Sequence, residues 1–172
     1  DLLTRMRELG AQASGYLRKE ARADAILARV RAAVRLRVRT LKRVRDLPFG
    51  AEVRGRLERV GSIPLLEAAA EGLEDATVTF ADSSSVTEME LRGGRMVSAT
   101  RTVQDGSLVR GEAALMHALG AATARFGVRR ATHAVRENLD GQLRALLRRC
   151  ARRISALEEC VSGAVLLDVH RL

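Results

Sequence analysis

The fold of this chain is decided by the stretch Val86-Thr87-Glu88-Met89-Glu90-Leu91-Arg92-Gly93-Gly94-Arg95-Met96-Val97-Ser98-Ala99. Apolar and polar residues alternate as far as Leu91, which is the period of a strand with one buried face. The glycine pair then supplies the positive φ angles that tight hairpin turns require. No GK[ST] sequence follows the pair, so we expect a hairpin turn there and not a phosphate-binding loop.

Further strands are expected on either side of this hairpin. Thr77–Phe80 is a short extended run, and Asp82-Ser83-Ser84-Ser85 is a turn signal between it and the hairpin. These three strands predict an antiparallel meander. Arg125–Val128 is expected to return as another strand, and Val53–Val60 is a further strand candidate.

Helices are predicted before, between and after the strands. Apolar residues recur every three or four positions from residue 23 to about Arg45, and Pro48 and Gly50 follow. The stripe is made of Ile26, Leu27, Val30, Val34, Val38 and Leu41. Ser62 is the expected N-cap of a short helix through Glu71. Further helices are expected over 111–119 and 139–161, so the fold class is α+β, with packed helices beside the meander.

The final predicted helix has two different faces. One carries Leu139, Leu143, Leu146, Cys150, Ile154, Leu157 and Val161, and the other carries Arg144, Arg148, Arg149, Arg152 and Arg153. We expect the apolar face to pack on the sheet and the arginines to face solvent. Pairing with a second copy, or groove binding to an acidic partner, remains open, and the arginines are a possible partner surface.

Composition restricts the class of protein. The chain has 47% apolar and 30% charged residues, as globular soluble proteins do, and no apolar run long enough to span a bilayer. We therefore expect a cytoplasmic protein with no membrane partner. The formal net charge of +9 attracts phosphates, but only 2% of residues are aromatic, so bases would find few stacking platforms.

No pattern of metal ligands or catalytic groups is present. Cys150 and Cys160 have neither zinc-site nor disulfide spacing and are expected to be buried thiols, and the three histidines are scattered. No pair of carboxylates has a catalytic spacing, and the serines of 83–85 lack a GxSxG context. We predict that the chain is not an enzyme and holds no cofactor or metal of its own.

The stretch from Gly10 to Glu20, GAQASGYLRKE, followed by Ile26–Val34, ILARVRAAV, resembles the end of bacterial response regulator receiver domains. In that family a GASGYLxK strand leads into the last helix of a doubly wound α/β sheet. The resemblance implies that residues 1–38 are the remnant of a receiver, made of helix 4, strand 5 and helix 5. Glu20 stands where proline is more common.

The resemblance also implies roles for two residues. Lys19 would contact the aspartyl phosphate through its ammonium group, and Tyr16 would be the aromatic residue that changes rotamer on phosphorylation. The phosphorylated Asp and the Mg²⁺ site would lie upstream of Asp1. A cognate histidine kinase would be the partner of the intact receiver.

Residues 54–162 resemble PATAN-type interaction domains, which occur beside receivers in bacterial regulators. The resemblance rests on Arg54–Glu58, Leu91–Ala99, Arg110–Leu115 and Ala124–Val128. Ala124 stands where the family usually has glycine. The resemblance implies a module that binds an unidentified protein partner.

Four segments follow from these interpretations. They are the receiver remnant 1–38, a basic helical extension and linker 39–53, the PATAN-like α+β domain 54–162, and the start of another element at 163–172. The chain starts at Asp1 instead of Met, so we expect a fragment.

The expected function is to transmit receiver phosphorylation to an output module. The basic stretch Arg29–Arg45 could be a solvated connecting helix, a dimer seam along Val30, Val34 and Leu41, or a site for an acidic partner. A homodimer is therefore possible. Nucleic acid is not our expected partner, but a basic nucleic-acid-binding α+β protein is the alternative hypothesis.

Overall fold

The computed structural model describes residues 22–121, 123–131 and 136–169, with side chains as far as residue 156. In these residues a six-stranded antiparallel sheet combines with helices, so the predicted α+β class is confirmed. The strands are β1 (Glu52–Arg56), β2 (Asp75–Ala81), β3 (Ser85–Arg92), β4 (Arg95–Val103), β5 (Leu108–Arg110) and β6 (Arg125–Arg130). Their order across the sheet is β1-β6-β2-β3-β4-β5.

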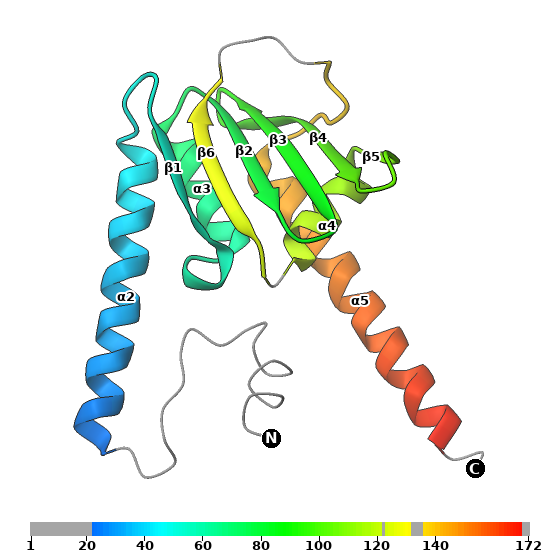
Figure 1. The fold of residues 1–172 in the computed structure, drawn as a ribbon. Coiled ribbons are helices and arrows are strands. Elements are labelled where there is room, and N and C mark those ends of the chain that lie inside the picture. The colour runs from blue at the N-terminus through cyan, green and yellow to red at the C-terminus, as the bar shows by residue number, and fades with distance from the viewer. Residues whose placement is uncertain (1–21, 122, 132–135, 170–172) are drawn as a thin grey trace.

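The helices lie on one side of the sheet and beside it. They are α2 (Ala23–Arg45), the short 3-10 helix η1 (Leu57–Arg59), α3 (Ser62–Gly72), α4 (Glu112–Gly120) and α5 (Leu143–Val169). Figure 1 shows α3, α4 and the first part of α5 behind the sheet, while α2 runs beside the β1 edge. The far parts of α2 and α5 both extend below the sheet, and they diverge. Within the described parts of the chain, no helix is both long enough and apolar enough to cross a membrane.

The central hairpin forms as the sequence predicts. Arg92 pairs with Arg95, and Gly93 and Gly94 form the two-residue turn with φ angles of 52° and 74°. Two successive positive φ angles are the requirement of a type I′ turn, which glycine meets without steric cost. The predicted turn before β3 is also present, since Asp82 Oδ1 accepts the backbone N–H groups at positions 84 and 85 (2.7 and 2.8 Å).

Strand alternation gives the sheet an apolar inner face and a polar outer face. Neighbouring strands place Val128, Val78, Met89 and Ala99 side by side on the inner face, where α3, α4 and α5 cover them. The residues one position along each strand point to the outer face, and they are Arg129, Thr77, Glu90 and Ser98. The core therefore lies between the sheet and the helices.

Strands β1 and β6 join two segments that are far apart in the sequence. Gly55 lies opposite Phe126 in the antiparallel register, and a Cβ on Gly55 would lie 2.7 Å from the Phe126 ring. The ring therefore covers the glycine, and the close approach requires that residue 55 have no side chain.

The first strand candidate and the expected cap of α3 were partly wrong. The strand ends at Arg56, and η1 follows at Leu57, whose N–H still donates to the Ala124 carbonyl at 2.9 Å. The N-cap of α3 is Gly61, with φ of 81°, and Ser62 is already helical. Its positive φ allows Gly61 to reverse the chain after η1.

The start of the last helix was also predicted too early, and one strand was missed. Helix α5 begins at Leu143, while Leu139 is buried in the preceding loop. Strand β5 has three residues and pairs with the end of β4, which is longer than predicted.

A β-bulge at Val97 attaches that loop to the sheet. The register shifts between Glu90–Ser98 and Leu91–Met96, so Val97 is the extra residue of β4. Its carbonyl accepts the N–H groups of residues 138 and 139 at 3.0 and 3.1 Å. The Asn138 side chain accepts the Ala99 N–H at 3.0 Å and donates to hydroxyls on residues 98 and 100. Bulges often redirect a strand in this way, and here the bulge positions the start of α5.

Candidate functional site

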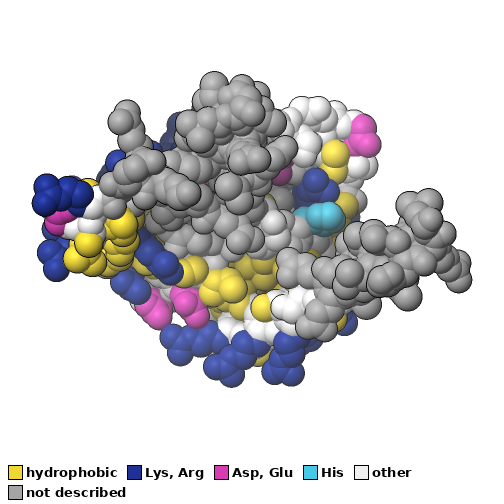
Figure 2. Space-filling view, turned by 90° about the horizontal axis from the view of Figure 1, so that it is seen from below, with side chains coloured by type: hydrophobic (Ala, Val, Ile, Leu, Met, Phe, Trp, Pro, Cys, Tyr) yellow, Lys and Arg dark blue, Asp and Glu magenta, His cyan; other side chains and the backbone are white. Residues whose placement is uncertain are grey.

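Helix α2 carries a row of exposed apolar side chains. We call them the α2 stripe, and their exposed fractions range from 42% to 60%. The α2 stripe consists of Ile26, Leu27, Val30, Val34 and Val38. Leu41, which the sequence predicts on the same face, is partly buried against the core. Exposed apolar patches of this kind are typical of interaction surfaces. Seen from below, the molecule has hydrophobic and basic side chains next to one another at its surface (Figure 2).

Basic residues flank the α2 stripe. In the described structure, Arg45 is the cation of α2 that makes an ion pair. The other basic residues of the helix have no acidic partner among the described residues, and they are Arg29, Arg31, Arg35, Arg37, Arg39, Lys42 and Arg43. The surface of α2 therefore combines apolar contact area with uncompensated positive charge.

The C-terminal end of α2 is fixed to the rest of the fold. Val44 and Leu47 are fully or almost fully buried in the core. Arg130 of β6 donates from Nε to the Leu47 carbonyl at 3.0 Å. The helix thus has one anchored end, and its stripe lies toward the other end.

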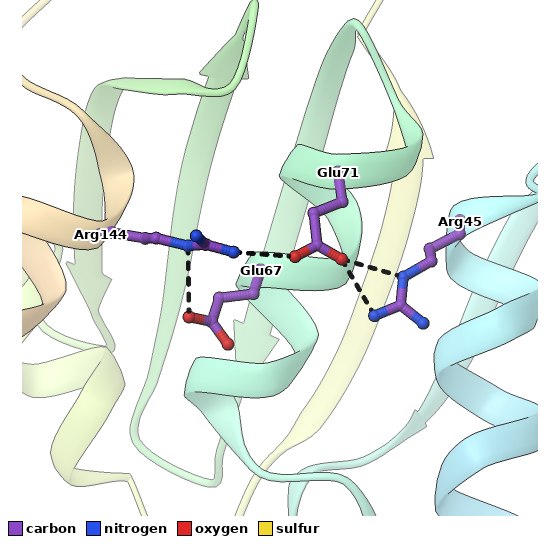
Figure 3. A network of polar contacts seen from close by, with 4 residues as sticks. All are labelled: Arg45, Glu67, Glu71 and Arg144. Carbon is purple, nitrogen blue, oxygen red and sulfur yellow. Dashed lines mark hydrogen bonds and ion pairs between the residues drawn. The ribbon is translucent and has the colours of Figure 1, made fainter.

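An ion-pair network connects α2, α3 and α5. Figure 3 shows Glu71 of α3 between Arg45 of α2 and Arg144 of α5. Glu71 Oε2 lies 3.0 Å from Arg45 Nη2, and its Oε1 lies 3.2 Å from Arg144 Nη2. Arg144 Nε is also 4.0 Å from Glu67 Oε1. The side chains are about half exposed, so each pair contributes little to stability, but together they link three helices.

The predicted arginine face of α5 has two kinds of members. Arg144 binds α3 as above, and Arg149 and Arg153 both pair with Glu112 of α4. Arg148 and Arg152 are exposed and have no ion pair within the described part of the chain. The arginines that attach α5 to its neighbours were not distinguishable in the sequence, because their partners lie on other helices.

The described part of the apolar face of α5 is buried, as the sequence predicts. Leu143, Leu146 and Cys150 are buried, while the side chains of Leu157, Cys160 and Val161 lie outside the described residues. Burial raises the pKa of the Cys150 thiol, and the charge of Glu112 raises it further. A buried thiol with a raised pKa is a poor nucleophile.

Glu90 is a buried acid on the outer face of the sheet. It is 4% exposed, and burial raises its pKa, although the Thr77 hydroxyl and the charge of Arg92 oppose the shift. Its Oε2 accepts no hydrogen bond and lies 3.4 Å from Arg92 Nη2. The sequence predicts an exposed strand position for Glu90, so its burial corrects that prediction.

Two residues with predicted roles lie outside the described residues. These are Lys19 and Tyr16, and the expected helix 4 and strand 5 of the receiver remnant fall on the same undescribed residues 1–21. In the part of the chain that is described, no group of three or more His, Cys, Asp or Glu side chains could hold a metal ion.

Comparisons with known proteins gave no family assignment. A scan against protein-family models, a search of curated proteins and a search of solved structures each found no match.

Proposed function

We propose that the chain is part of a phosphorelay response regulator, in which α2 transmits the state of a receiver domain to a protein-interaction module. The module comprises the sheet with α3, α4 and α5. In this proposal the chain is a cytoplasmic signalling protein and not an enzyme. A histidine kinase supplies the phosphoryl group, and Mg²⁺ binds in the receiver upstream.

The observation that supports the proposal most is the exposure of the α2 stripe. The last helix of a doubly wound receiver packs its apolar face on a parallel sheet, so the same helix without that sheet exposes a stripe. The residues just before α2 carry the receiver-like GAQASGYLRKE string. The α2 stripe is therefore the expected packing surface for residues 1–21 and for the receiver sheet.

Anchoring of α2 provides a route for transmission. Val44 and Leu47 fix its C-terminal end in the module, so a movement of its N-terminal part acts on α3 through Arg45 and Glu71. Glu71 also holds Arg144, so the same carboxylate connects α2 to α5. A receiver with two states could bias this contact, because phosphorylation shifts populations between conformations.

The first test is the coding sequence upstream of Asp1. Within one domain length, on the order of 100 residues, it should encode a strand that ends in two acidic residues and another that ends in a single Asp. An upstream frame without these features would remove the basis of the proposal.

The second test uses the chain extended by that upstream sequence. Addition of beryllofluoride and Mg²⁺ should change amide hydrogen exchange in α2 and in the first turns of α5. Replacing the single Asp by Asn should abolish the change. An exchange pattern that is the same with and without beryllofluoride would argue against transmission through α2.

Nucleic-acid binding is the second candidate, and the unpaired cations of α2 favour it. Arg148 and Arg152 on α5 add to this charge. Binding to phosphates would weaken steeply and linearly with salt on a log-log plot. A duplex titration at two ionic strengths distinguishes the candidates, because the protein-interaction proposal expects no sequence-selective binding at physiological salt. A matched pair of variants, Arg35→Gln and Arg56→Gln, would show whether α2 carries the affinity.

A further inference from the structure

A cavity lies between the inner face of the sheet and helices α4 and α5. Its volume is about 680 Å³, which is within the range of small-molecule sites. The apolar part of its wall consists of Phe80, Ala113, Met116, Ala118, Ala121, Ala124 and Ile154. None of the residues that line the cavity belongs to the α2 stripe.

Polar side chains enter this cavity from strands whose inner face is otherwise apolar. Met89 and Ala99 are buried inward-facing residues on β3 and β4, and alternation by two places Thr87 and Arg101 on the same face. Thr87 and Arg101 lie opposite each other in the register, and both line the cavity. An inward-facing arginine is an informative exception, because arginine is almost never buried without a partner.

The guanidinium group of Arg101 has binding capacity that the described residues do not use. Its Nε donates to Ser85 Oγ at 3.0 Å, and within the described structure it makes no ion pair. A guanidinium has five N–H donors in a planar fork that matches a carboxylate. Four of these donors remain for a ligand or for water.

The partner of Arg101 is itself held in place. Ser85 is 8% exposed, and its hydroxyl lies 3.2 Å from Asp82 Oδ2. Asp82 also accepts the N–H groups of residues 84 and 85, and hydrogen bonds to this turn, the Ser84 N–H above all, lower its pKa. Asp82 therefore stays ionised and orients Ser85, which in turn positions the Arg101 side chain.

We propose that this cavity binds a small organic acid with an apolar body and one carboxylate. The carboxylate pairs with the free end of Arg101, and the Thr87 hydroxyl and His117 supply further donors. The apolar body lies against Phe80, Met116 and Ile154. A partly buried ion pair of this kind needs the further hydrogen bonds that the Thr87 hydroxyl and the His117 imidazole provide.

The charge balance of the cavity favours a monoanion. Arg101 is the guanidinium that lines it, and the ionised Asp82 lies on the same wall. A phosphate dianion would leave one negative charge without a cation and repelled by Asp82. A single carboxylate matches the single arginine.

The test uses the full chain with decanoate and naphthylacetate as probes, and with decanol and decylamine as uncharged and cationic controls. The methyl carbon of Met116 reports binding by NMR, and the fully buried Met89 and Met96 serve as internal references. We expect both acids to shift the Met116 signal in a saturable manner. Decanol and decylamine should bind at least tenfold more weakly, because charged hydrogen bonds contribute most here.

Two variants and a control test the roles of the residues. Arg101→Gln should weaken decanoate binding about tenfold or more, whereas Arg110→Gln, on the neighbouring strand and exposed, should leave it unchanged. Met116→Trp fills the cavity and keeps Arg101, so it should abolish binding by calorimetry. Circular dichroism checks that each variant folds. If Arg101→Gln does not fold, Met116→Trp still tests the site.

Three outcomes would overturn the proposal. One is the absence of a saturable shift with either acid. Another is equal affinity for decanol and decanoate, which would make the cavity a purely apolar surface. The last is full affinity in Arg101→Gln or in Met116→Trp, which would place the acid elsewhere on this basic protein.

Discussion

Gly72 of α3 lies directly against the backbone of Arg45 at the end of α2. A Cβ on Gly72 would lie 2.5 Å from the Arg45 carbonyl oxygen and 2.7 Å from its carbonyl carbon. Backbone atoms cannot move aside as a flexible side chain can, so the crossing of these two helices requires glycine at this position. The same crossing places Arg45 beside Glu71, which precedes the glycine.

Replacing Gly72 by alanine should therefore destabilise the protein. Overpacking at a fixed crossing costs about 1–3 kcal/mol, and the strain should also loosen α2 from α3. Chemical denaturation measures the free energy of unfolding. Gly120→Ala is the matched control, because no atom lies within 4 Å of a Cβ there. Equal stability of the two variants would contradict the close crossing.

Because one part of α2 is exposed and its end is buried, substitutions along this helix should differ strongly in their effect on the free energy of unfolding. Val34 is 53% exposed and Val44 is fully buried. In the 172-residue chain, Val34→Gln should change the free energy of unfolding by less than about 0.5 kcal/mol. Val44→Ala should cost roughly 1–3 kcal/mol, because it leaves a cavity. In a chain that includes an intact receiver, Val34→Gln should become destabilising, and an unchanged stability there would weaken the proposed docking.

Glu90 predicts a pH dependence of stability. Because burial raises its pKa in the folded state, its protonated form is favoured by folding. The contribution of Glu90 is then fully present below the pKa of an unfolded glutamate, and it is lost as the pH rises through the folded pKa. Glu90→Gln should stabilise the protein at neutral pH and flatten the pH profile of its thermal midpoint. Glu74→Gln, an exposed acid just before β2, should change neither, and identical profiles for both variants would refute the assignment.

Asn138 should contribute to stability beyond its size. Its side chain makes three hydrogen bonds to β4, and removal leaves the Ala99 N–H without this acceptor. Asn138→Ala should cost about 1–3 kcal/mol. Gln142→Ala is the control in the same connection, because its side chain is exposed. Hydrogen exchange of the Ala99 amide should increase in the first variant alone, and an unchanged rate would show that the side chain does not protect it.

Local sequence patterns were sufficient to predict much of the fold. The alternation around Met89, the glycine pair and the three-four spacing of α2 each depend on neighbouring residues, and each predicted its element. Strand β5 was missed because three residues give no periodicity. The bulge at Val97 depends on pairing across two strands, so the importance of Asn138 had no local signal.

The functional sites were harder to predict from the sequence than the helices and strands. Partners of the α5 arginines lie on α3 and α4, and no sequence spacing encodes those pairs. Arg101 is different, because continuing the alternation of β4 two residues beyond Ala99 would have placed it inward. The sequence therefore contained the information, but the strand was predicted only as far as Ala99.

The insertion of β6 between β1 and β2 has a consequence for biosynthesis. Among the described strands β1 pairs with β6 alone, so β1 has no hydrogen-bonding neighbour among them until residues 125–130 emerge from the ribosome. During that interval α2 and β1 are connected to the growing sheet through the chain alone, without strand pairing. Contacts between segments distant in the chain form slowly, so completion of the sheet waits for β6, the last of the described strands. A nascent chain stalled before Phe126 should therefore remain a substrate for chaperones.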